Sequence, residues 1–98
     1  TSNRKPIDII KQLGKKYTNL PEAKQQKAKS EIQLLAKEVS YEDLEPLLNT
    51  AAKKVGTRIA VLITLKVLMA NGLRTNIKVN DFLLAAKSDK NPLLSQGG

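Results

Sequence analysis

The sequence TRIAVLITLKVLMANG, residues 57–72, is the most apolar stretch of the chain and decides its fold. A single charge interrupts it, and on a helical wheel at about 100° per residue Lys66 lies on the same side as Ile59, Leu62 and Ile63. The other polar residues lie elsewhere, so the helix has no broad polar face. A helix that is apolar on nearly every side must be covered by its neighbours. The stretch therefore predicts an all-α protein, a compact bundle of four or five short helices around a central helix at about 57–71.

Length and composition agree with a small helical domain. A chain of 98 residues is one domain by size, and apolar residues make up 41% of it while aromatic residues make up only 3%. The core must then be aliphatic, which suits helices packed on helices better than packed sheets. We expect a single helical domain over residues 1–88. The last ten residues, 89–98, lack periodicity and are expected to form a flexible C-terminal tail.

Apolar residues at helical spacing predict further helices around the central one. These additional helices are expected at about 4–17, 20–39, 46–55 and 80–88. The clearest stripe is in the first of them, where Ile7, Ile10, Leu13 and Tyr17 recur on one face. Three residues of the sequence, 77–79, are expected to be a short extended piece.

Prolines and glycines set the expected boundaries. Pro46 lacks an N–H and favours a turn at 41–45 followed by a helix, with one continuous helix from 41 through a kink as the alternative. Gly56 suits the position after the last turn of that helix, where a left-handed backbone is common. Gly72 is expected to stop the central helix, and Asn80 to cap the final one.

The residue types exclude most catalytic chemistry. The chain has no cysteine and no histidine, so neither a disulfide, nor a Cys/His metal site, nor a Ser–His or Cys–His pair can form. Glu42, Asp43 and Glu45 are the only carboxylate cluster, and their place after Ser40 favours stabilisation of a helix start over catalysis. No glycine-rich phosphate loop is present. We therefore expect a protein that is not an enzyme, with no cofactor and no metal.

No part of the sequence indicates a membrane span or a targeting segment. The longest apolar run, 59–70, contains Lys66 and is shorter than the roughly 20 residues that cross a bilayer. The N-terminal apolar run is too short for a signal peptide. The sequence thus predicts a soluble, cytoplasmic protein.

The charge of the chain favours a polyanionic partner. Its 17 Lys and Arg against 9 Asp and Glu give a net charge of +8. Basic residues dominate 1–40 and 50–98, whereas 41–49 holds three acidic residues and no basic one. Such a balance is typical of proteins that bind nucleic acid, although lysines on helices are also ordinary solvated side chains.

The candidate phosphate contacts share a basic side chain near a predicted helix end or loop. They are Arg4, Lys5, Lys15, Lys16, Lys24, Lys27, Lys53, Lys54, Arg58, Arg74 and Lys78. Lysines outnumber arginines, and aromatic residues are few, so we expect contact with the nucleic-acid backbone or shape and not with base edges. A helix-turn-helix is disfavoured because the loop before the last helix is longer than the three or four residues of that motif.

A second hypothesis makes the protein an interaction module. It would be an adaptor, an inhibitor or immunity-type bundle, a domain of a larger assembly, or a homo-oligomer. The side of the central helix around Lys66, with Ile59, Leu62 and Ile63, would then be covered by a partner chain whose acidic residue meets the ammonium group. The sequence does not decide between DNA, RNA and protein as the partner.

Overall fold

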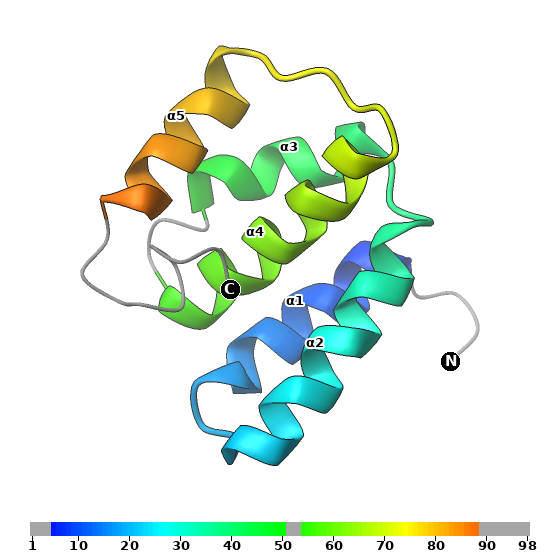
Figure 1. The fold of residues 1–98 in the computed structure, drawn as a ribbon, viewed down its shortest axis with the longest axis vertical. Helices are drawn as coiled ribbons and strands as arrows, with labels where there is room; N and C mark the ends of the chain where they lie inside the picture. Colours follow the sequence, from blue (N-terminus) through cyan, green and yellow to red (C-terminus); the bar gives the residue numbers. More distant parts are fainter. Residues whose placement is uncertain (1–4, 51–53, 89–98) are drawn as a thin grey trace.

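Five helices form the part of the chain that the computed structural model describes, residues 5–50 and 54–88 (Figure 1). In chain order they are α1 (Pro6–Tyr17), α2 (Glu22–Ala36), α3 (Tyr41–Thr50), α4 (Val55–Ala70) and α5 (Ile77–Lys87). The predicted all-α bundle is therefore confirmed. The predicted tail at 89–98 lies outside the described residues.

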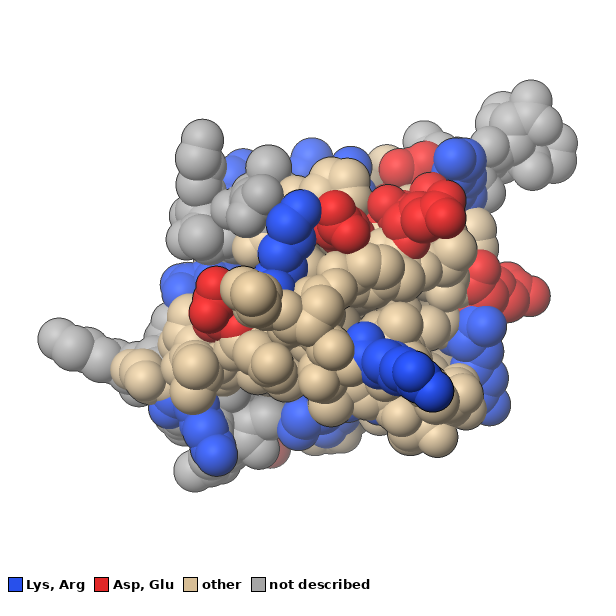
Figure 2. All heavy atoms as spheres, turned by 90° about the horizontal axis from the view of Figure 1, so that it is seen from above, with Lys and Arg blue, Asp and Glu red and all other residues tan. Residues whose placement is uncertain are grey.

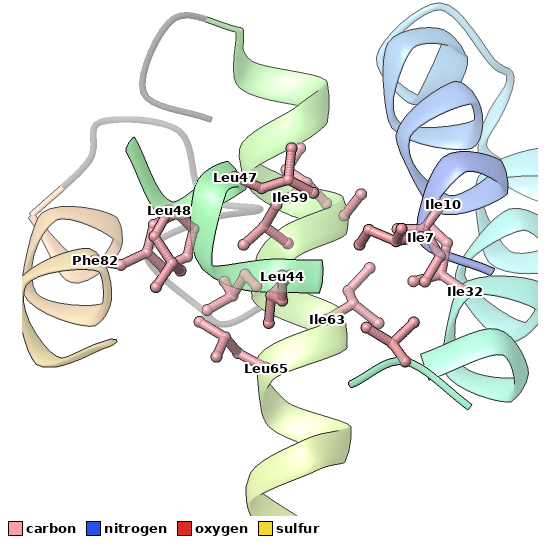
Figure 3. Packing of buried hydrophobic residues seen from close by; sticks show 14 of the residues in the cluster. Ile7, Ile10, Ile32, Leu44, Leu47, Leu48, Ile59, Ile63, Leu65 and Phe82 are labelled. Atoms are coloured by element: carbon pink, nitrogen blue, oxygen red, sulfur yellow. The ribbon is translucent and has the colours of Figure 1, made fainter. Parts of the chain in front are cut away.

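Helix α4 is the centre of the bundle, as its apolar sequence predicts. It packs most extensively against α1 and α2, and less against α3 and α5. Figure 3 shows Ile7, Ile10 and Ile32 on one side of α4, and Leu48 and Phe82 on the opposite side. The buried residues of α4 are Gly56, Ile59, Ala60, Val61, Leu62, Ile63, Thr64 and Leu65. The one polar side chain among them, Thr64, donates its hydroxyl to the Ala60 carbonyl at 2.9 Å, which removes the cost of burying it.

Burial on α4 stops abruptly after Leu65. Lys66 is exposed, residues 67–69 are half-buried, and Ala70 is exposed again. The neighbouring helices therefore cover α4 on all sides from Ile59 to Leu65 and leave part of its last third open. Gly72 follows with φ 107°, a left-handed conformation that suits glycine, so the predicted stop of this helix is confirmed.

Two glycines bring α1 and α4 into backbone contact. A Cβ atom placed on Gly56 would collide with the carbonyl oxygen of Gly14, and a Cβ on Gly14 would lie 3.0 Å from the Cβ of Ala60. Gly56 lies in the first turn of α4, so the prediction that it follows the end of the preceding helix is wrong. Its lack of a side chain serves the close approach of two helices and not a left-handed turn.

The boundaries of α3 and α5 correct two further predictions. Helix α3 begins at Tyr41 and continues through Pro46, so the expected turn at 41–45 is wrong and the alternative of one continuous helix is correct. Leu44, Leu47 and Leu48 bury its apolar face. Residues 77–79 are helical and not extended, because the side-chain oxygen of Asn76 accepts a hydrogen bond from the Val79 N–H at 2.9 Å. Asn76, not Asn80, is therefore the N-cap of α5.

None of the five helices in the described ranges has the length and apolar character that a membrane crossing needs.

Candidate nucleic-acid interface

Four predicted phosphate contacts lie at one end of the α1–α2 hairpin. Lys15 and Lys16 belong to the last turn of α1, Lys24 and Lys27 belong to the first turns of α2, and all four side chains are exposed. The turn between the two helices places these segments together at one end of the molecule (Figure 1).

The start of α4 reaches the same end. Gly56 contacts Gly14 one turn before the end of α1, and a Cβ on Gly56 would lie 3.9 Å from the Cγ2 of Thr18. Lys54 is the N-cap of α4 and is exposed. We call Lys15, Lys16, Lys24, Lys27 and Lys54 the basic end.

Local hydrogen bonds hold the hairpin turn of the basic end in shape. The side-chain amide of Gln25 donates to the Tyr17 carbonyl at 3.0 Å, and the Asn19 N–H donates to the Lys16 carbonyl at 3.0 Å. These bonds satisfy carbonyls that the end of α1 leaves without helical partners. Lysines in the last turn of α1 also complement the negative end of its dipole.

Acidic residues offset little of this charge. Between Asp8 and Glu31 the sequence has one acidic residue, Glu22, in the first turn of α2. The basic end therefore carries a local excess of positive charge along both helices of the hairpin.

Two other predicted phosphate contacts lie elsewhere and form ion pairs with α3. The Lys5 ammonium lies 3.7 Å from a carboxylate oxygen of Asp43, and the Lys78 ammonium donates to Oε1 of Glu45 at 2.9 Å. The hydrogen bond and charge of Lys78 lower the pKa of Glu45, and Glu45 in turn raises the pKa of Lys78. These two lysines therefore offset the acidic residues of α3, and the structure does not group them with the basic end.

The face seen from above has no continuous basic surface. Figure 2 shows acidic side chains gathered along one edge of this face, basic side chains scattered mostly around its rim, and a wide uncharged surface between them. Positive charge is thus unevenly distributed over the molecule.

The remaining predicted phosphate contacts do not join the basic end. Arg58 is half-buried and lines a pocket of about 200 Å³ with Leu48 of α3 and Phe82 of α5. Arg74 is exposed in the loop after α4. Arg4 and Lys53 lie outside the described residues.

Most residues of the predicted partner surface on α4 are buried in the hydrophobic core. Ile59, Leu62 and Ile63 are 0%, 2% and 2% exposed, because α1, α2 and α3 cover the helix at these positions. Three of the four predicted partner contacts are therefore not on the surface, which corrects the interaction hypothesis. Lys66 is exposed at the point where this covering ends.

A groove between α2 and α4 was not predicted from the sequence. It has a volume of about 310 Å³ and is lined by Lys29, Gln33, Ile63, Lys66, Val67 and Ala70. Lys29 and Gln33 lie one turn apart on α2, and that spacing is visible in the sequence. What the sequence does not show is which helix lies opposite them.

The described residues contain no group of three or more acidic side chains arranged to hold a metal ion. Comparison of the chain with family models, with curated proteins and with solved structures finds no match in any of the three.

Proposed function

We propose that the protein binds the phosphate backbone of nucleic acid through the basic end. The observation that carries this proposal is that four exposed lysines flank the turn between α1 and α2, and that the exposed Lys54 precedes the first turn of α4, which packs against the end of α1. Lysine ammonium groups bind phosphates as point charges and release the counterions condensed on the nucleic acid.

The composition of the chain supports binding that is independent of base sequence. Only three of its basic residues are arginines, the residue that most often reads guanine, and it has two tyrosines and one phenylalanine for base stacking. Contacts to phosphates alone position a protein on a duplex without reading its sequence.

Fluorescence anisotropy with a labelled DNA duplex, repeated with an RNA duplex, tests the proposal. We expect affinity at low salt that falls steeply as salt rises, with a logarithmic slope of about 0.9 for each DNA phosphate contacted. Lys16→Gln combined with Lys24→Gln removes two charges from the basic end and should reduce that slope by about 1.8.

A matched control removes two charges elsewhere. Lys5→Gln combined with Lys78→Gln affects lysines that are already paired with Asp43 and Glu45, so the slope should stay close to that of the unmodified protein. Undetectable binding at low salt contradicts nucleic-acid binding. Equal losses from the two double variants contradict the assignment to the basic end.

A further inference from the structure

The basic end presents lysines from two neighbouring helices, and the chain holds its aromatic side chains away from the surface. Lys15 and Lys16 belong to the last turn of α1, and Lys24 and Lys27 belong to the first turns of α2. We infer that the basic end prefers double-helical nucleic acid to single strands, an inference that rests on the proposed function and names the form of its ligand.

All three aromatic residues of the chain lie within the described ranges, and none of them is exposed. Tyr17 follows Lys16 at the basic end, but only 3% of it is exposed because it packs into the core. Phe82 is 7% exposed. Tyr41 packs against the core, and its hydroxyl accepts a hydrogen bond from Asn76 at 2.7 Å. Each base that stacks on an aromatic side chain strengthens single-strand binding by roughly 5- to 150-fold, and this protein offers no such ring.

Arginine is the other side chain on which bases stack, and the basic end consists of lysines. Within the described residues, Arg58 is half-buried beside Leu48 and Phe82, and Arg74 follows the opposite end of α4 from Lys54. A lysine ammonium group binds phosphate as a point charge and has no flat face for a base. A single strand would therefore bind through its phosphates alone, and it would also lose conformational freedom when it is ordered on the surface.

The spacing of α1 and α2 fits the two backbones of a duplex. The two helices pack against each other, which places their axes about 8–10 Å apart. The grooves of B-form DNA are about 6 Å and 12 Å wide, so lysines from the two helices can reach phosphates on both sides of one groove. A duplex also carries one charge per roughly 1.7 Å of its axis and keeps its own bases stacked. It therefore supplies what the basic end can bind and needs nothing that the basic end lacks.

Fluorescence anisotropy with a labelled DNA duplex of about 20 base pairs, and with the same labelled strand alone, tests the inference. The strand is chosen so that it cannot pair with itself. Even if both forms contact five lysines, the logarithmic salt slope should be about 4.5 for the duplex and about 3.5 for the strand. At about 50 mM salt the duplex should then bind about twentyfold more tightly. An RNA duplex should likewise bind more tightly than its own single strand.

The outcomes separate this inference from the proposed function. If the single strand binds as tightly as the duplex, and Lys16→Gln combined with Lys24→Gln weakens both, the preference for a duplex is overturned and nucleic-acid binding stands. If neither form binds at low salt, the proposed function fails and the inference fails with it.

A tryptophan added to the basic end tests the physical reason for the preference. Asn19 is exposed in the turn between α1 and α2, and its backbone N–H donates to the Lys16 carbonyl, a bond that a substitution retains. Asn19→Trp should strengthen single-strand binding about fivefold or more by stacking on one base, and should leave duplex binding within about twofold. Because the chain has no tryptophan of its own, fluorescence of the new ring reports directly on its contact with a base.

Asn80→Trp is the matched control, since Asn80 is exposed on α5 and lies outside the basic end. This variant should leave the affinities for both forms unchanged, and circular dichroism checks that the two variants fold alike. If Asn19→Trp gains no affinity for the single strand, or gains no more than Asn80→Trp, then missing base stacking does not set the preference and the inference is overturned.

Discussion

The crossing of α1 with α4 and the contact of α3 with α5 are held together by different means. At the crossing, Gly14 and Gly56 have no side chains, and the backbones of the two helices touch. Between α3 and α5, polar side chains make the visible links: the Asn76 amide donates to the Tyr41 hydroxyl at 2.7 Å, and Lys78 pairs with Glu45. The first contact depends on shape, so added volume should break it. The second adds exposed polar links to the packing of buried residues such as Leu48 and Phe82, so its polar part should respond to charge and pH, with smaller effects.

The side chains near the crossing of α1 with α4 are more completely buried than those of α5. Near the crossing, Ile59 and Ala60 of α4 are almost completely buried, whereas α5 leaves Ile77 79% and Leu84 63% exposed. Helix α5 is attached mainly through one face, with Val79, Phe82 and Ala86 buried. We therefore expect substitutions at the crossing to affect the whole fold and substitutions in α5 to have smaller effects.

The largest expected effect is that of Gly56→Ala. In an exposed helix interior this change stabilises a protein by about 1 kcal/mol. Here the new methyl group would collide with the Gly14 carbonyl oxygen and force the helices apart, so we expect a net loss of about 2–4 kcal/mol in the free energy of unfolding. Urea unfolding followed by circular dichroism measures the difference.

Gly14→Ala is the matched control for the crossing. Its methyl group would lie 3.0 Å from the Ala60 Cβ and 3.1 Å from the Gly56 carbonyl oxygen, which is tight but not a full overlap. We expect a smaller loss than for Gly56→Ala. A Gly56→Ala protein as stable as the original would show that the two backbones are not in contact.

The two glycines also show where sequence analysis succeeds and fails. The apolar run and the stop at Gly72 are local patterns, and they predict α4 almost to its ends. Gly56 has two possible uses, a left-handed turn or a close helix contact, and only the position of α1 decides between them. Pro46 is similar: the burial of Leu44, Leu47 and Leu48 keeps α3 helical despite the missing N–H donor.

Some features of the candidate site can be predicted from local sequence patterns, and others cannot. Composition and periodicity predict that Lys15, Lys16 and Lys24 are exposed, because lysines off an apolar stripe remain in water. The pairing of Lys78 with Glu45 joins residues 33 positions apart. No local pattern contains such a pair, and the same holds for the groove between α2 and α4.

An intermediate effect is expected for Asn76→Ala. The substitution removes the N-cap hydrogen bond to the Val79 N–H and the hydrogen bond to Tyr41. Loss of an N-cap costs about 1 kcal/mol, and the exposed bond to Tyr41 adds little. Chemical denaturation should therefore show a loss of about 1 kcal/mol, with amide exchange fastest in the first turn of α5.

Asn80→Ala separates the observed cap from the one that the sequence suggests. Asn80 is exposed within α5, where alanine is the better helix former, so this variant should be as stable as the original protein or slightly more so. If Asn80→Ala costs more than Asn76→Ala, then α5 begins at the later residue.

The smallest expected effect is the pH dependence of the contact between Glu45 and Lys78. Because Lys78 lowers the pKa of Glu45 in the folded protein, the carboxylate stabilises the fold above the unfolded pKa of about 4.3, and this contribution is lost as pH falls through the lowered folded pKa. The pKa of Lys78 is raised, so its contribution is present below about pH 10.4 and is lost as pH rises through the folded pKa. Both side chains are exposed, and solvent screening keeps the change in stability small.

Carboxyl ¹³C chemical shifts measure the pKa of Glu45 itself, which is more sensitive than stability. Lys78→Gln should raise that pKa toward its ordinary value, because it removes both the hydrogen bond and the charge that lower it. Lys5→Gln, which alters the pair with Asp43 on the same helix, should leave the pKa of Glu45 nearly unchanged. A Glu45 pKa that ignores Lys78→Gln would mean that α5 is not held to α3 by this pair, and the contact would then rest on Asn76 and the buried residues of α5 alone.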